Sequence, residues 1–231
     1  MKEGKVMGEI ILTTEQREKY NEIVGKTYFN RFQKYIIRLG IFEGFDVSWY
    51  AKPELEDLQM LNIFKGLKRN LDISYYADPK FNYKQMDEIL EGLEKGIDVS
   101  IYSNSNLNYS TMEFVKNYLL KNEDKRIFDN LNLLDFNDLQ ITEFEIGFKK
   151  NLDISVYANP KFDYKQMQQI RKGLMRNLDI TIYANEDFDW QQMAEIRLGL
   201  KNGIDISIYL NPGINWKEMK RIRLELESNN E

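Results

Sequence analysis

The stretch GLMRNLDITIYANEDFDWQQMAEIRLGL, residues 173–200, is a full copy of the unit from which most of this chain is built. Its D-[I/V]-[S/T]-x-Y core recurs every 26 residues, apart from one interval of 55 that contains a degenerate copy, DKRIF, and three additional residues. The intact copies begin at Asp46, Asp72, Asp98, Asp153, Asp179 and Asp205. A fixed period of this length indicates a repeat array in which each unit packs on its neighbours.

The second half of each unit has the pattern of an α-helix. It begins with an apolar residue followed by Asn or Asp in seven of eight copies, and Gln or Glu usually follows three residues later. This is the pattern of an N-cap with a capping box. Apolar residues then recur at a 3-then-4 spacing, and the segment ends at Gly or Asn, which tolerate a left-handed C-cap. The sequence therefore predicts eight long helices of about 14 residues each.

The D-[I/V]-[S/T]-x-Y segments between these helices are ambiguous. Residues 152–157 alternate apolar and polar side chains and are rich in β-formers, which is typical of a strand. The Asp is equally a good N-cap for a short helix, and the degenerate copy DKRIF is a poor strand. We favour short helices, and hence an all-α solenoid in which eight long helices alternate with short ones. The alternative is an α/β horseshoe with short parallel strands at these segments.

The repeats also define the domain organisation. Residues 29–231 form the repeat solenoid, in which residues 107–135 are a degenerate unit with an insertion. Residues 1–28 are predicted to form an N-terminal cap, with Thr14 as a candidate N-cap of a helix over about residues 15–24.

Composition excludes several classes of function. The chain of 231 residues has no His and no Cys, which rules out imidazole bases, thiol nucleophiles, disulfides and the usual zinc sites. The net charge of −5 argues against non-specific nucleic-acid binding. No signal peptide or run of about 18 apolar residues is present, so we expect a cytoplasmic protein without a membrane span. We expect no catalytic residues, metal or cofactor, and no small-molecule substrate is evident.

Three invariant ladders of residues have structural interpretations. The Asp ladder is expected to cap the short helices rather than to bind cations or sugars. The Tyr ladder, at Tyr50 and its equivalents, is expected to pack between layers with its hydroxyls at the edge rather than to stack bases. The Gly ladder lies inside the helices, where Gly costs about 1 kcal/mol relative to Ala, and therefore predicts close approach of the neighbouring short element.

Positions that differ between repeats are better candidates for a binding site, because the scaffold does not dictate them. One position past the buried Ile, the C-terminal helices present an Arg row, Arg171, Arg197 and Arg223, with Lys172 and Arg221 beside it. Such a row could meet an acidic protein face or a phosphate backbone, and the alternative is a solvated face. The degenerate unit adds Tyr118, Lys125 and Arg126. Departure from the repeat consensus there indicates an added binding site, and the alternative is simple sequence drift. We predict that these eight residues contact a partner.

The consensus GLxxGLDISIYAxPxFDWxQMxxIRxGL resembles a repeat found in Firmicutes-type, low-GC bacterial proteins, which phages, plasmids and integrative elements often encode. The resemblance covers about residues 29–227. It implies a role such as inhibition of a host defence complex, for instance as an anti-CRISPR protein. Solenoids offer long surfaces and no enclosed pocket, so we expect a non-enzymatic protein that binds and modulates or inhibits a protein complex. The alternative is an RNA- or DNA-binding solenoid that uses the Arg row.

Overall fold

A computed structural model of the chain describes residues 10–121, 126–129 and 131–229. Within these residues all regular structure is helical, with α-helices and short 3-10 helices and no strand. The all-α prediction is therefore confirmed, and the alternative horseshoe with strands is wrong. The chain divides into two compact units, Met1–Asp124 and Lys125–Glu231, which are described separately below.

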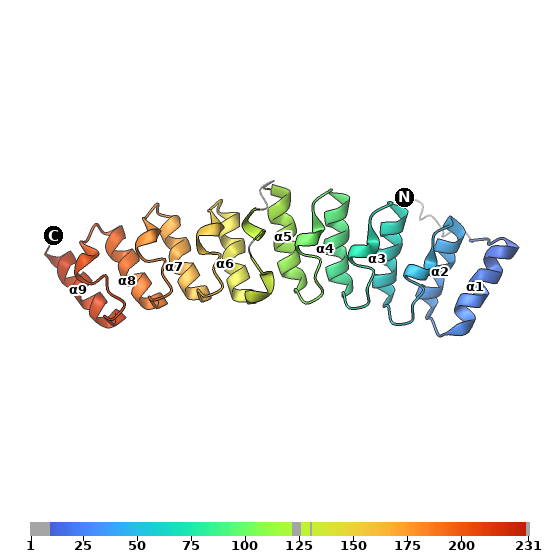
Figure 1. Cartoon of the computed structure of the whole chain (residues 1–231), viewed down its shortest axis with the longest axis horizontal. Coiled ribbons are helices and arrows are strands. Elements are labelled where there is room, and N and C mark those ends of the chain that lie inside the picture. The colour runs from blue at the N-terminus through green and yellow to red at the C-terminus, as the bar shows by residue number, and fades with distance from the viewer. Residues whose placement is uncertain (1–9, 122–125, 130, 230–231) are drawn as a thin grey trace, which may run out of the picture. The chain divides into compact units, whose positions relative to one another are not determined.

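In the first unit, long helices stand side by side in chain order, and each packs on the next (Figure 1). The α-helices are α1 (Thr14–Lys26), α2 (Arg31–Glu43), α3 (Asp57–Lys68), α4 (Tyr83–Glu94) and α5 (Tyr109–Lys121). The 3-10 helices between them are η1 (Val47–Trp49), η2 (Ile73–Tyr75) and η3 (Val99–Ile101). The predicted cap helix is α1, but Thr13 rather than Thr14 caps it and exchanges two hydrogen bonds with Gln16.

The second unit repeats the same arrangement. Its α-helices are α6 (Asp138–Lys149), α7 (Tyr164–Leu174), α8 (Trp190–Lys201) and α9 (Trp216–Ser228). Its 3-10 helices are η4 (Arg126–Phe128), η5 (Leu133–Asp135), η6 (Ile154–Tyr157), η7 (Ile180–Ile182) and η8 (Ile206–Ile208). The D-[I/V]-[S/T]-x-Y segments are thus short helices, as predicted, because each Asp side chain accepts the N–H of the Ser or Thr two residues later.

The helix ends follow the local sequence signals. Asp163 is typical of the starts, where its Oδ1 accepts from the N–H groups of Lys165 and Gln166 at 2.7 and 2.8 Å. The predicted ends have positive φ angles at Gly44, Asn70, Gly96, Asn151, Asn177 and Gly203. Asn122 lies outside the described residues. Asn229 differs from the prediction, since its φ of −87° is not left-handed.

The capping-box glutamines also tie successive repeats together, which the sequence analysis did not foresee. The Oε1 atom of Gln166 accepts the N–H of its own N-cap, Asp163, at 2.8 Å, and its Nε2 atom donates to the carbonyl of Phe188 in the next repeat at 2.7 Å. The same pair of bonds recurs at Gln33, Gln59, Gln85, Gln140 and Gln192. The Gln side chain can make both bonds because its amide has an acceptor oxygen and a donor nitrogen, whereas the carboxylate of a Glu could only accept.

The Gly and Tyr ladders contact each other within each of the six intact repeats, and we call this contact the Gly–Tyr lock. A Cβ atom at Gly173 would lie 1.9 Å from the Tyr183 hydroxyl, and the other five pairs give 1.7–2.1 Å. The Tyr183 hydroxyl is fully buried and donates to the carbonyl of Gln169 at 3.2 Å. The predicted close approach at Gly is therefore confirmed, while the expectation that the hydroxyls lie at the edge is wrong. Where Tyr118 replaces the Gly in the degenerate unit, Phe128 replaces the Tyr, and the hydroxyl that demands the Gly is gone.

Candidate anion-binding site

The predicted Arg row of the second unit is buried rather than exposed. Arg171, Arg197 and Arg223 are 8%, 9% and 7% exposed. Each Nε atom donates to a side chain 28 residues earlier, on the preceding α-helix. The acceptors are Glu143 at 2.7 Å, Gln169 at 3.0 Å and Glu195 at 2.8 Å. The prediction of an exposed row is wrong because this helix position faces the neighbouring helix, which periodicity within one helix does not show.

Differences between repeats at this position follow from the pairing. Two equivalent cations occur in the first unit: Arg38, which donates to the main-chain carbonyl of Ile10, and Lys116, which is buried and forms an ion pair with Glu88 on the preceding helix at 2.6 Å. In each of these repeats the acceptor therefore lies 28 residues before the cation. This spacing was visible in the sequence and is the signal that would have predicted the pairs.

Arg197 is the exception among the pairs formed by two side chains, because its acceptor is neutral. Arg171 and Arg223 each face a carboxylate within 2.8 Å, whereas no carboxylate of the described residues forms an ion pair with Arg197. The nearby Glu195 forms its ion pair with another residue, since its Oε2 accepts a hydrogen bond from Arg223. The two terminal nitrogens of Arg197 make no hydrogen bond to any described residue, and burial lowers the pKa of its guanidinium. Arg197 is thus a buried cation with no direct ion pair among the described residues, and the carboxylate near it, Glu195, is bonded to Arg223.

Three further cations surround Arg197 and define, with it, the cationic cluster: Arg171, Lys172, Arg176 and Arg197. Burial, followed by the positive charges of Arg197 and Arg171, lowers the pKa of Lys172. Its Nζ donates to the neutral Gln168 at 2.7 Å. Arg176 is exposed, and its Nη1 donates to the Lys172 carbonyl at 3.4 Å. In this cluster only Arg171 has an ion-pair partner among the described residues, so the positive charge is largely unbalanced.

The cationic cluster lies among apolar side chains. Ile146, Lys172, Leu198 and Leu224 occupy equivalent positions in four successive repeats, and the three apolar members form what we call the apolar row. Leu224 is 48% exposed, and Ile146 and Leu198 are half-buried. Met175 is 46% exposed, and its Sδ accepts from Arg171 Nη1 at 3.6 Å. This surface therefore combines exposed apolar groups with a cation that lacks a counter-ion.

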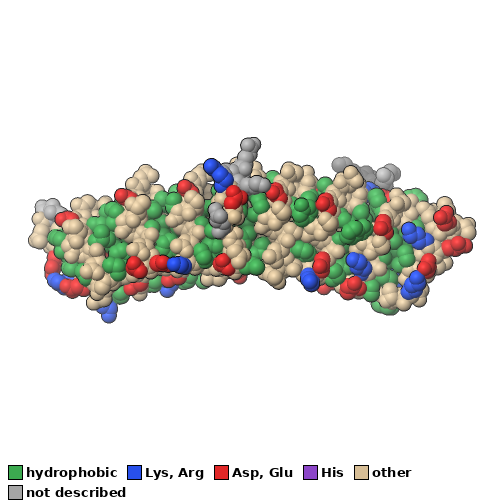
Figure 2. Space-filling model, viewed as in Figure 1, with side chains coloured by type: hydrophobic (Ala, Val, Ile, Leu, Met, Phe, Trp, Pro, Cys, Tyr) green, Lys and Arg blue, Asp and Glu red, His purple; other side chains and the backbone are tan. Residues whose placement is uncertain are grey.

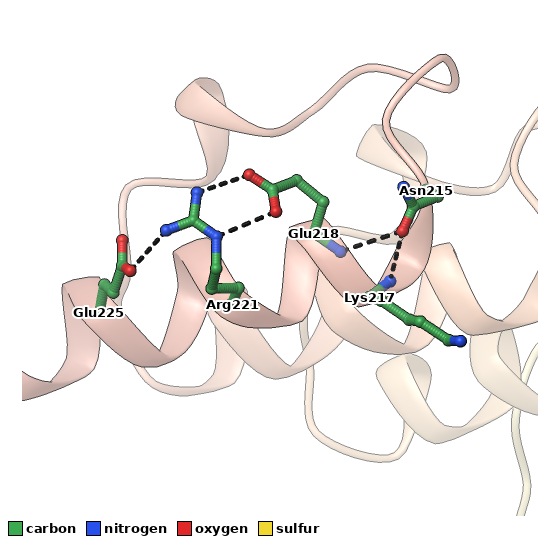
Figure 3. Close-up of polar contacts among 5 residues, drawn as sticks. All are labelled: Asn215, Lys217, Glu218, Arg221 and Glu225. Atoms are coloured by element: carbon green, nitrogen blue, oxygen red, sulfur yellow. Dashed lines mark hydrogen bonds and ion pairs between the residues drawn. The ribbon is translucent and has the colours of Figure 1, made fainter.

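The other predicted site residues do not join this cluster as free charges. Figure 3 shows Arg221 held between Glu218 and Glu225 of its own helix, at 2.5 Å from each carboxylate. These two contacts raise the pKa of Arg221. Arg223 is neutralised by Glu227 at 2.6 Å in addition to Glu195. Both arginines therefore have their charge balanced within the unit.

The predicted residues of the degenerate unit belong to different compact units of the structure. Tyr118 lies on α5 of the first unit, half-buried, with its ring 6.2 Å from that of Phe114. Arg126 is exposed at the start of η4 in the second unit, and Lys125 lies outside the described residues. Arg176 and the neutral acceptor Gln169 were not among the residues predicted from the sequence.

Other kinds of site find little support in the part of the chain that the structure describes. There, no group of three or more Asp or Glu side chains is arranged to hold a metal ion. No described helix has the length and apolarity needed to cross a bilayer. Comparisons with protein-family models, with curated proteins and with solved structures found no match.

Proposed function

We propose that the protein is a non-enzymatic binding scaffold that engages another protein through the second unit. A carboxylate of the partner would bind the cationic cluster, and apolar side chains of the partner would pack on the apolar row and Met175. The observation that carries this proposal is Arg197, a buried guanidinium whose acceptor Gln169 is neutral. Charge-assisted bonds between guanidinium and carboxylate are among the stronger polar contacts available to an interface.

The energetics favour an external anion at this position. A buried charge without a partner reduces the stability of the fold, and a partner that supplies the opposite charge recovers part of that loss on binding. Burial of the neighbouring apolar side chains adds about 25 cal/mol per Å² of surface removed from water. A surface that combines a buried Arg with apolar side chains has the composition of a typical protein interface, in which the centre is apolar and Arg is enriched.

A protein partner fits better than nucleic acid. A phosphate backbone is bound by several free cations in a row, but Arg221 and Arg223 are already paired with carboxylates. On the face shown in Figure 2, basic and acidic side chains are interspersed and form no continuous basic stripe along either unit. The net charge of −5 also opposes a polyanion. Inhibition of a defence complex, which the resemblance implies, is the narrower form of this proposal.

The decisive variant is Gln169→Glu, which supplies the carboxylate that Arg171 and Arg223 already have in Glu143 and Glu195. The control is Asn211→Asp, which makes the same change of charge in an exposed loop and keeps the acceptor for the Gly213 N–H. Wild type and both variants are immobilised and used to capture proteins from lysate of the source cells, with and without nuclease, and the captured protein is quantified.

We expect Gln169→Glu to weaken capture of the same protein about tenfold, as for loss of one charge-assisted contact, while Asn211→Asp leaves it unchanged. Thermal unfolding of both variants checks that neither has lost its fold. Equal capture by all three proteins contradicts the assignment to the cationic cluster. Captured material that disappears after nuclease treatment supports the nucleic-acid alternative instead.

A further inference from the structure

A cavity of about 460 Å³ in the first unit plays no part in the function proposed above. It is formed by α1, by the connection that follows α1, and by the first two turns of α2. Six of its lining residues are three cations and three tyrosines: Arg31, Lys34, Arg38, Tyr20, Tyr28 and Tyr35. No Asp or Glu is among the lining residues. Its volume lies within the roughly 300–1,000 Å³ of small-molecule sites.

The cations of this cavity are not neutralised by its walls. Arg38 donates from Nη2 to the carbonyl of Ile10, and its Nε atom is buried without a hydrogen-bond partner among the described residues. Lys34 Nζ stands over the ring of Tyr28, 5.9 Å from the centroid. No ion pair joins Arg31, Lys34 or Arg38 to a carboxylate of the described residues. The cavity thus contains a buried donor without an acceptor and two further cations. An anion bound there would supply the missing acceptor and balance the positive charge.

The tyrosines add flat apolar surfaces to these charges. Tyr28 is 83% exposed, which is high for an aromatic side chain beside a cavity. Tyr35 is half-buried and stacks on Phe32, with ring centroids 6.5 Å apart and an angle of 27° between the rings. Aromatic side chains of this kind bind planar rings by stacking, which for nucleic-acid bases contributes about 1–3 kcal/mol per base.

We propose that this cavity binds a small phosphorylated aromatic ligand of the nucleoside monophosphate class. The phosphate is held by Arg31, Lys34 and Arg38, and the base stacks on Tyr28 or Tyr35. The site is independent of the cationic cluster, since it lies in the other unit. Phosphate recognition by an Arg and Lys set and base recognition by aromatic faces each use groups that the cavity presents.

The test is isothermal titration calorimetry of the full chain at low salt with four ligands: AMP, CMP, adenosine and inorganic phosphate. We expect one AMP or CMP to bind per chain, and adenosine and phosphate to bind at least tenfold more weakly. Lys34→Gln is expected to weaken nucleotide binding about tenfold. The matched control is Lys84→Gln, which removes a Lys that also stands over a Tyr ring, 4.6 Å from the centroid of Tyr109, but away from the cavity.

A second measurement addresses the aromatic part of the site. NMR of the bound nucleotide is expected to show upfield ring-current shifts of the base protons that Tyr28→Ala reduces, and the high exposure of Tyr28 means that this variant keeps its fold. The proposal is overturned if phosphate binds as tightly as AMP, or if Lys84→Gln weakens binding as much as Lys34→Gln. It is equally overturned if no nucleotide binds at millimolar concentration.

Discussion

The lock between Gly173 and Tyr183 allows a quantitative test of how each repeat is held together. Gly173→Ala places a Cβ atom 1.9 Å from the Tyr183 hydroxyl and 2.8 Å from Ile180 Cγ2, both far inside van der Waals contact. The hydroxyl cannot move away freely, because it is buried and donates to the Gln169 carbonyl at 3.2 Å. The substitution must therefore displace η7 from α7 or break this hydrogen bond.

The size of the effect follows from three contributions. Overpacking of a close-packed interior costs about 1–3 kcal/mol, and the lost hydrogen bond adds about 1 kcal/mol. The better helix propensity of Ala returns about 1 kcal/mol. We therefore expect Gly173→Ala to lower the free energy of unfolding by about 2 kcal/mol, and Tyr183→Phe, which removes only the hydroxyl, to lower it by about 1 kcal/mol.

The double variant Gly173→Ala with Tyr183→Phe tests whether the two substitutions act on one shared contact or destabilise the protein independently. Without the hydroxyl, the closest atoms to the new Cβ are Ile180 Cγ2 at 2.8 Å and the Tyr183 Cζ atom at 3.2 Å, so much of the clash is relieved. We expect the double variant to lose about 1.5 kcal/mol less than the sum of the single variants. Urea unfolding followed by circular dichroism measures all three values. Gly25→Ala in α1, where nothing lies within 4 Å of the new Cβ, is the control and should not destabilise the protein.

Additive losses in the double variant would refute this reasoning, because they would mean that the Gly and the hydroxyl do not constrain each other. A Gly173→Ala protein as stable as Gly25→Ala would do the same. The degenerate unit already points to the expected result, since it lacks both the Gly and the Tyr hydroxyl, with Tyr118 and Phe128 in their places.

Three further predictions concern the polar contacts of the repeats. Gln166→Glu replaces the donor to the Phe188 carbonyl with an acceptor and should cost about 2 kcal/mol in urea unfolding. Glu218→Gln in α9 weakens only an exposed ion pair with Arg221 and should cost less than about 1 kcal/mol; equal effects would contradict the role of the amide. Burial raises the pKa of Tyr209 to about 12 from 10.0, so the stability linked to this group is complete below pH 10 and is lost as pH rises from 10 towards 12. The tyrosinate absorbance that belongs to Tyr209, measured as the difference between wild type and Tyr209→Phe, should therefore rise together with loss of helix in an alkaline titration, and its rise with the helices intact would contradict it. The hydrogen bonds from Ser74 lower the pKa of Asp72 below 3.8, so its contribution is present above that pH and is lost as pH falls; NMR titration should show that Ser74→Ala raises this pKa, and an unchanged value would refute the assignment.

Features governed by local interactions were predictable from the sequence. The starts and ends of the long helices follow from N-caps, capping boxes and left-handed C-caps, whose partners lie within a few residues along the chain. The short helices are local for the same reason, since each is started by an Asp side chain that accepts the N–H two residues later. The need for Gly at positions such as Gly173 was also foreseen, because six mid-helix glycines at a fixed period require a reason.

The candidate site was predicted only in part. Arg171, Lys172 and Arg197 were correctly placed close to one another, but the row was expected to face solvent. Its burial depends on a partner 28 residues away, so that one helix alone does not reveal which of its faces meets the next. Arg221, by contrast, is neutralised by residues three and four positions away, which the sequence already contained.

The sequence by itself determined the period, the helix boundaries and the all-α class of this protein, because these depend on contacts between near neighbours in the chain. Only the tertiary structure decided which variable residues are buried, which buried cation lacks a carboxylate, and where a hollow remains. Arg197 is exceptional only once Gln169 is placed opposite it. The cavity lined by Lys34 and Tyr28 exists only once α1 packs on α2, since its walls come from both helices and their connection.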